Sequence, residues 1–273
     1  MIEDDYEFFK GNKLIGNDFN YSEILQWYSD EENAYAKLLE NSSSSYEYSY
    51  HEFNKFHAMN FLANSYWKNE KINALGLGAA YGDEFQPISN ILESITIVDP
   101  SDKFQTKHPS LNVKWVKPLP SGIFEFNDAC YDLVTSLGAL HHIPNVEFVL
   151  QEIHRVLRKD GLLVLREPVV SMGDWNKDRP GLTKRERGIP LNILLRFFSN
   201  IGFKIEYKQL CMFTPFPVLL SKMGYSGSIY NNKLLTLVDH LLSKVFTFNA
   251  STYHRKTVLS KIAPSSVYFI LRK

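Results

Sequence analysis

Short apolar runs alternate with polar, helix-forming intervals between residues 72 and 170 of the chain. Five of these runs have the length of β-strands, and they cover residues 72–77, 95–98, 113–116, 133–136 and 162–165. The clearest helix between them is predicted over 146–157, where apolar side chains recur at helical spacing. Strands that alternate with helices predict right-handed crossovers and a mainly parallel sheet covered on both faces. The expected fold class is therefore α/β.

The regions on either side of this core have different patterns. Residues 1–70 are polar, aromatic and mostly helical in period, with a break at the serine run 42–45 and a second helical stretch over 52–67. After a loop rich in glycine, proline and charge (171–188), the pattern predicts a helix near 191–201, a strand near 204–210, a helix around 234–245 and a final strand over 266–271. We therefore expect an N-terminal helical cap (1–70), a ligand-binding core (71–170) and a C-terminal extension (171–273) that completes the sheet and the acceptor site.

Composition limits the classes of partner and location. Lys plus Arg and Asp plus Glu both number 30, so the net charge is zero and no basic stripe points to nucleic acid as a partner. The two cysteines, Cys130 and Cys211, lack the spacing of a disulfide framework or a zinc site. The chain starts with an acidic run, and no segment approaches the roughly 18 apolar residues that a membrane helix needs. We expect a cytoplasmic protein without a transmembrane segment.

Two short motifs near the first two predicted strands suggest a ligand site. The first strand leads into a glycine-rich turn, G-L-G-A-A-Y-G over 76–82, where the backbone and the free N–H groups of a helix start can approach a ligand. A plain tight turn is the alternative, because a glycine-rich turn alone is a weak motif. Asp99 ends the second strand about 20 residues later, which suits a bidentate hydrogen bond to ribose hydroxyls, although a turn or cap aspartate is also common there.

Two further motifs complete a recognisable series. Residues 131–145 read Y-D-L-V-T-S-L-G-A-L-H-H-I-P-N, and residues 152–164 read E-I-H-R-V-L-R-K-D-G-L-L-V. In this order and spacing the four motifs resemble class I S-adenosylmethionine-dependent methyltransferases of the type-11 kind, over roughly residues 72–170. The resemblance implies a Rossmann-like core, S-adenosylmethionine as the cosubstrate, and transfer of its methyl group.

The resemblance also assigns cofactor-binding positions. It implies that one group of residues surrounds the methionine portion, the ribose, the adenine and the sulfonium in turn: Gly76, Gly78, Gly82, Asp99, Pro100, Ser121, Ser136, Leu137 and Gly138. The chain departs from the family pattern at Gly76, where an acidic residue usually stands, and at Ala80, where a glycine does. Either another group holds the methionine ammonium, for which Asp83 is a candidate, or the affinity is reduced. A non-catalytic protein that keeps the fold is a further alternative.

Candidate catalytic groups follow the fourth and fifth strands. Histidine is a natural general base near neutral pH, and His141 is preferred over His142 for that role, with one of the pair expected to pack structurally. Glu167 ends the fifth strand, where a carboxylate could face the acceptor. A base is useful only if the acceptor is a hydroxyl, and we expect no metal to be required.

The acceptor is predicted from two peripheral segments. Tyr48, Tyr50 and His51 offer aromatic faces and polar groups of the kind that bind sugars, while Arg179 and Arg187 offer forks that bind phosphate or carboxylate. The loop 171–188 more loosely resembles methyltransferases of bacterial polysaccharide and sugar biosynthesis. The resulting hypothesis is O-methylation of a sugar, nucleotide sugar or glycan. N- or C-methylation of a small natural product is the alternative, and an NAD-dependent dehydrogenase is disfavoured because Tyr81 replaces its third glycine.

Overall fold

A single seven-stranded sheet forms the centre of the computed structural model, which describes residues 3–41, 47–68, 70–105, 113–175, 177, 179 and 181–273. The strands are β1 (Ile72–Leu77), β2 (Leu92–Val98), β3 (Val113–Val116), β4 (Tyr131–Leu137), β5 (Leu157–Pro168), β6 (Lys204–Phe213) and β7 (Pro264–Arg272). Their order is β3-β2-β1-β4-β5-β7-β6. β7 runs antiparallel to both of its neighbours, and the other six strands share one direction. The predicted α/β fold with a mainly parallel sheet is confirmed, and the two late strands belong to the same sheet.

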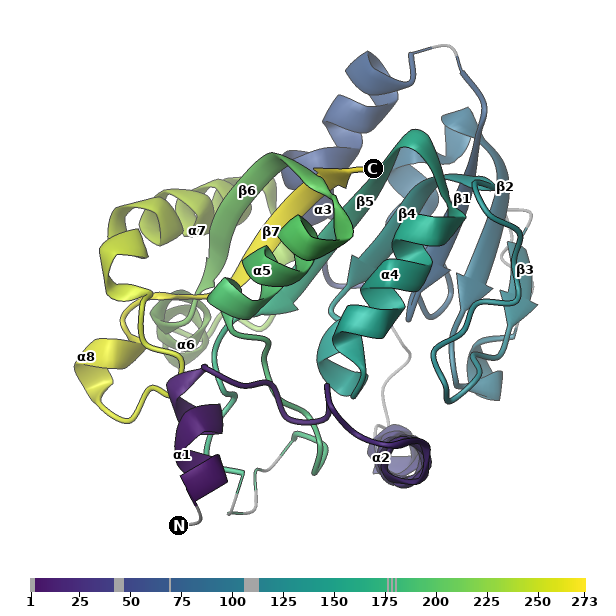
Figure 1. Ribbon diagram of the computed structural model, residues 1–273. Coiled ribbons are helices and arrows are strands. Elements are labelled where there is room, and N and C mark those ends of the chain that lie inside the picture. The colour runs from purple at the N-terminus through teal and green to yellow at the C-terminus, as the bar shows by residue number, and fades with distance from the viewer. Residues whose placement is uncertain are drawn as a thin grey trace.

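Helices cover both faces of the sheet, as Figure 1 shows. On one face, α4 (Val146–Val156) and α5 (Leu191–Ile201) bury apolar side chains at helical spacing, such as Val149, Ile153 and Phe197. On the other face lie α3 (His51–Asn54), its continuation through two π-helical turns (Lys55–Met59 and Leu62–Tyr66), and α7 (Lys233–Val245). The predicted helices over 146–157, 191–201 and 234–245 are thus present, and Gly202 ends α5 in the left-handed conformation expected there.

The segment after the glycine turn differs from an ordinary α-helix. Residues Asp83–Ile91 form a 3-10 helix with Pro87 inside it. Proline lacks the N–H that an α-helical hydrogen bond needs, which helps to explain the tighter, irregular winding. Its buried side chains are Glu84, Phe85, Ile88 and Ile91.

Two N-terminal helices lie at the edge of the sheet where the parallel strands end. These are α1 (Glu3–Lys10) and α2 (Tyr21–Asn41), and Figure 1 shows both below the arrowheads of the parallel strands. The indole Nε1 of Trp27 in α2 donates a 2.7 Å hydrogen bond to the carbonyl of His142. The helix is therefore attached to the loop that follows β4. The predicted serine break, 42–45, lies outside the described residues.

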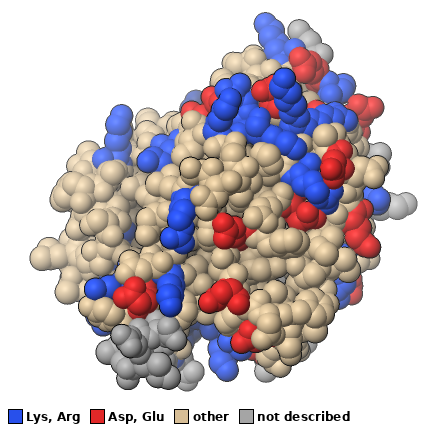
Figure 2. Space-filling model, viewed as in Figure 1, with Lys and Arg blue, Asp and Glu red and all other residues tan. Residues whose placement is uncertain are grey.

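The remaining helices form an outer layer beside β6 and β7. They are α6 (Pro215–Lys222) and α8 (Val258–Lys261), next to α7. Figure 2 shows charged side chains gathered toward the top and right of this view, with fewer charges over the outer layer at the left. Within the described part of the chain, no helix is long and apolar enough to cross a bilayer.

Candidate functional site

A cavity of about 850 Å³ opens at the carboxyl ends of β1, β2 and β4. The strand order reverses here, because β2 and β3 continue the sheet on one side of β1 and β4 continues it on the other. Open α/β sheets bind their ligands in the crevice at such a switch point. The volume lies within the range of cofactor and small-molecule sites.

The glycine turn forms one wall of this cavity. Gly78 lines it with a φ of +66°, and its N–H donates to the carbonyl of Val98 at 2.8 Å. A Cβ at Gly78 would lie 2.6 Å from the Cβ of Ala139, so only glycine lets the turn close against the loop after β4. Gly76 and Gly82 are not among the lining residues, and they shape the turn instead: added Cβ atoms there would meet Ala79 and Ile97. Ala80, at the position where the family has glycine, holds a positive φ of 47°.

Asp99 reaches the cavity from the end of β2. Its Oδ2 accepts from the N–H of Ala80 at 3.2 Å, and its Oδ1 accepts from the N–H of Ser101 at 3.0 Å. Burial raises the pKa of Asp99, and the two N–H groups only partly counter that rise. Asp99 thus has the turn role given as the alternative and also lines the cavity, while its role toward the ribose stays a prediction. Pro100 also lines the cavity, whereas Ser121 does not, although Gly122 beside it does.

The end of β4 contributes Leu137 and Gly138 to the lining. Ser136 is fully buried and is not a lining residue. Gly138 has a φ of +89°, and a Cβ there would lie 3.3 Å from Nη2 of Arg166. Two of the three predicted positions beside the sulfonium thus reach the cavity.

Two buried ionisable residues in the lining, Glu84 and Arg166, were not predicted from the sequence. Glu84 lies on the 3-10 helix, its carboxylate accepts a hydrogen bond from the hydroxyl of Thr135, and burial raises its pKa to about 7. Arg166 lies near the end of β5 and donates from Nη2 to the carbonyl of Leu137 at 2.9 Å. Its Nη1 is buried without a hydrogen-bond partner among the described residues. Asp83, the predicted replacement for the missing acidic residue, is not a lining residue, and Glu84 next to it is.

Glu167 lies elsewhere than predicted. Its carboxylate is fully buried and does not line the cavity. It accepts from the backbone N–H groups of Ala139 (3.0 Å) and Leu140 (2.8 Å) and from Nδ1 of His141 (2.7 Å). Glu167 therefore holds the turn after β4 and orients His141, instead of facing an acceptor.

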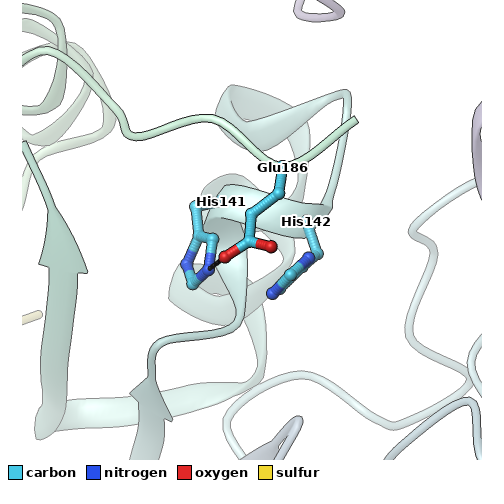
Figure 3. A group of neighbouring side chains, drawn as sticks. All are labelled: His141, His142 and Glu186. Atoms are coloured by element: carbon cyan, nitrogen blue, oxygen red, sulfur yellow. Dashed lines mark ion pairs between the residues drawn. The ribbon is translucent and has the colours of Figure 1, made fainter. Parts of the chain in front are cut away.

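His141 and His142 both line the cavity from a single 3-10 turn, Leu140–His142. Nε2 of His141 lies 3.5 Å from Oε1 of Glu186, which Figure 3 shows directed toward the two imidazole rings. Burial alone would lower the pKa of His141, but the charges of Glu167 and Glu186 and their hydrogen bonds raise it to about 9. Nδ1 of His142 donates to Oε2 of Glu31 at 2.8 Å, and burial together with the charge of His141 lowers the pKa of His142.

The predicted acceptor residues divide into two groups. Tyr48 and Tyr50 line the cavity, and His51 does not. Arg179 donates to four backbone carbonyls of its own loop. Arg187 is buried, and its guanidinium group donates to the carbonyls of Ile15, His141, Ile143 and Pro144. These arginines organise the loop and are not among the cavity-lining residues, which corrects the expectation that they face an acceptor anion.

The lining carries more negative than positive charge. Its carboxylates are Glu31, Glu32, Glu47, Glu84, Asp99 and Asp102, and its cations are Lys103, Arg166 and, with its raised pKa, His141. Such a cavity favours neutral or cationic ligands over phosphates. The sulfonium of S-adenosylmethionine has the favoured sign.

Comparison with known proteins agrees with this geometry. Residues 75–165 match the family described as a methyltransferase domain. An uncharacterised methyltransferase of Bacillus subtilis is 25% identical over 127 residues, which cover 44% of this chain and 50% of that protein. The chain spans half or less of the length of the curated relatives it matches.

Solved structures show the same fold at low identity. An S-adenosylmethionine-dependent methyltransferase of Mesorhizobium loti superimposes with a TM-score of 0.51 at 13% identity, over 81% of this chain and 98% of that one. A 4+2 cyclase superimposes with a TM-score of 0.50 at 13% identity, over 91% and 94% of the two chains. Residues 75–165 therefore match a methyltransferase domain, and this match supports the predictions of a methyltransferase and of S-adenosylmethionine as cosubstrate. Since this fold also carries other activities, the reaction has to be argued from the cavity.

Proposed function

We propose that the chain binds S-adenosylmethionine in the cavity at the switch point and transfers its methyl group to a hydroxyl of a neutral, sugar-like acceptor. The observation that carries this proposal is the pairing of Gly78 and Asp99 at the ends of β1 and β2, inside the segment that matches the methyltransferase family. The same crevice holds a buried carboxylate for ribose hydroxyls and an open backbone for the rest of the ligand.

The amino-acid end of the cosubstrate is a zwitterion, and the cavity offers a charge of each sign for it. Glu84 is a buried carboxylate suited to the ammonium, in place of the acidic residue that Gly76 replaces. Arg166 is a buried guanidinium whose Nη1 has no hydrogen-bond partner in the part of the chain that the structure describes, and it suits the carboxylate. An unpaired buried donor is costly, and a bound carboxylate would satisfy it.

The reaction needs alignment more than covalent machinery. A lone pair of the acceptor oxygen forms the bond to the methyl carbon while the methyl–sulfur bond breaks and its electron pair returns to sulfur. S-adenosylhomocysteine leaves, and the hydroxyl proton passes to water. Holding the two reactants in line supplies most of the acceleration in such a step.

Tyr48 supports the sugar-like acceptor, because an aromatic ring can stack on a sugar while its hydroxyl bonds to it, whereas one face of the Tyr50 ring is covered by the Arg166 guanidinium. The excess of lining carboxylates argues for a neutral sugar or glycan over a nucleotide sugar. The same carboxylates favour a second candidate, N-methylation of an amine. A role in polysaccharide biosynthesis and a cytoplasmic location stay predictions.

Calorimetry with S-adenosylhomocysteine and a methyl-transfer screen test the proposal together. The screen contains neutral sugars and glycan fragments, nucleotide sugars, amines and phenols, and mass spectrometry detects the gain of one methylene. We expect binding of S-adenosylhomocysteine and product only from neutral sugars. Product from amines alone would replace the first candidate by the second, and absence of cofactor binding would contradict both.

A further inference from the structure

We propose that His141, His142 and Glu186 bind a divalent transition-metal cation at the edge of the cavity. One ligating atom from each of these residues lies within 4.8 Å of the other two. The two histidines come from the turn after β4, and Glu186 comes from the loop 171–188, so the set joins the core to the C-terminal extension (Figure 3). Metal binding itself does not depend on the proposed methyl transfer.

The hydrogen bonds around the two histidines are those of metal ligands. Nδ1 of His141 is bonded to Glu167, and Nδ1 of His142 is bonded to Glu31, at 2.7 and 2.8 Å. Nε2 is then the nitrogen that each ring offers to a cation. Metal-ligating histidines nearly always donate their other N–H to a carboxylate or carbonyl in this way, which fixes the tautomer and raises the basicity of the ligand.

The carboxylate partners are themselves held in place. Oε2 of Glu186 accepts from the N–H of Thr183 at 3.1 Å, which leaves Oε1 as the oxygen that faces His141. Glu31 accepts from the hydroxyl of Thr183 at 2.9 Å and from the N–H of Arg185 at 3.2 Å. Glu167 is anchored by the backbone of the β4 turn. Each ligand is therefore oriented by a second contact.

The donor set selects the kind of cation. Two imidazoles and one carboxylate suit Zn²⁺, Fe²⁺, Co²⁺ or Mn²⁺, whereas Mg²⁺ and Ca²⁺ prefer oxygen ligands. Three protein ligands leave a coordination position open, as in catalytic zinc sites. His141 and His142 line the cavity, so an open position there would face a bound acceptor.

The role of the metal rests on the proposed function. A hydroxyl oxygen bound to a divalent cation has a lowered pKa and gives up its proton to water more readily. Its lone pair can then form the bond to the methyl carbon as the methyl–sulfur bond breaks. Because Nδ1 of His141 is bonded to Glu167 and Nε2 is the nitrogen proposed as a ligand, a metal would supply this activation in place of a free imidazole base.

Cobalt is the probe for the test. The full-length chain is treated with a chelator, dialysed, and titrated with Co²⁺ in the absence of S-adenosylmethionine, with visible absorption and calorimetry as readouts. We expect one Co²⁺ per chain, with absorption bands of nitrogen and oxygen ligands and without thiolate charge-transfer bands. Zn²⁺ should displace the Co²⁺.

Three variants locate the binding. Glu186→Gln retains an oxygen for the Thr183 N–H and should weaken Co²⁺ binding by at least about tenfold, as should His142→Gln. The matched control is His154→Gln, because His154 packs on Phe203 away from the cluster, and its Co²⁺ affinity should stay within about twofold of the wild type. Thermal melts confirm that each variant is folded.

The outcomes separate the two proposals. Failure of the wild-type chain to bind Co²⁺, or binding that folded Glu186→Gln and His142→Gln leave unchanged, overturns the metal site. S-adenosylhomocysteine affinity is measured on the same samples. Absence of that affinity while Co²⁺ binds contradicts the proposed methyl transfer and leaves the metal site standing.

Discussion

The guanidinium carbon of Arg166 lies 3.9 Å from the centroid of the Tyr50 ring. Arg166 belongs to β5, and Tyr50 immediately precedes α3, so this contact joins the N-terminal region to the core at the cavity wall. A cation over an aromatic face is stabilised without consuming its N–H donors. Arg166 is thus held in place while Nη1 stays available for a ligand.

The first prediction tests Arg166 as the partner of the cosubstrate carboxylate. Arg166→Met should weaken the binding of S-adenosylhomocysteine by roughly 1.5–3 kcal/mol, the range for a hydrogen bond to a charged group. Methylthioadenosine lacks the amino-acid portion, and calorimetry should show its affinity almost unchanged. The exposed Arg196→Met is the control. Equal losses for both ligands would assign Arg166 to folding of the cavity instead.

The second prediction concerns the ribose. Asp99→Asn should weaken both S-adenosylhomocysteine and methylthioadenosine by roughly 1.5–3 kcal/mol, because both ligands carry the ribose hydroxyls. The amide oxygen of asparagine can accept from only one of the two N–H groups that Asp99 now serves, so a thermal melt accompanies the calorimetry. The exposed Asp18→Asn should leave both affinities unaltered. Unchanged binding in folded Asp99→Asn would remove Asp99 from the site.

A third prediction follows from the pKa of Glu84, which is raised from 4.5 to about 7 by burial. A carboxyl group whose pKa is raised in the folded chain favours the protonated folded state. Its contribution to stability is complete below pH 4.5 and is lost as the pH rises through about 7. Glutamine cannot ionise, so the free energy of unfolding of Glu84→Gln should rise relative to that of the wild type as the pH increases from 4.5 to about 7. The pKa difference corresponds to at most about 3 kcal/mol of unfolding free energy.

Urea denaturation between pH 5 and pH 8 checks this prediction. The unfolding free energies of the wild type and of Glu84→Gln should diverge as the pH rises. The exposed Glu93→Gln should show the same pH dependence of stability as the wild type. Parallel curves for Glu84→Gln as well would mean that Glu84 keeps its ordinary pKa in the folded chain.

The strands, and the site positions at their ends, could be predicted from the sequence for a physical reason. Short apolar runs have few ways to be buried other than as strands of a covered sheet, and the ends of adjacent parallel strands meet at one edge. The glycine turn with Gly78 and the strand end with Asp99 were predicted from this pattern, Leu137 and Gly138 from the family resemblance, and all four line the cavity.

The charged side chains were less predictable, because their partners come from distant segments. Arg187 and Arg179 carry guanidinium groups of the kind that bind anions, yet in this chain these groups donate to backbone carbonyls. Glu84, next to Asp83, lines the cavity from a segment that winds as a 3-10 helix, and neither the helix type nor the role of this residue was predicted. Proline at position 87 was the available signal.

The fourth prediction follows from the buried fork of Arg187. Arg187→Met leaves the carbonyls of His141 and Ile143 without their charged donor and should lower the free energy of unfolding by about 3 kcal/mol or more. Because these carbonyls belong to the turn that carries the histidines, Co²⁺ affinity should fall as well. Lys184→Met, in the same loop, is the control for loss of a surface charge. A stable Arg187→Met chain with altered affinity only for an anionic acceptor would restore the role predicted from the sequence.

The fifth prediction compares two glycines with similar backbone conformations. Gly78 and Gly181 have φ values of +66° and +80°, so alanine at either position costs about 1–2 kcal/mol in backbone strain. At Gly181 no atom of the described residues lies within 4 Å of the added Cβ, whereas at Gly78 the Cβ of Ala139 lies at 2.6 Å. Gly78→Ala should therefore be less stable than Gly181→Ala by a further 1–3 kcal/mol or so, the usual range for overpacking. Only Gly78→Ala should also lose affinity for S-adenosylhomocysteine, because Gly78 lines the cavity. Denaturation and calorimetry on the two variants decide the matter, and equal stability with equal affinity would show that the turn relaxes around the extra methyl group and does not touch the ligand.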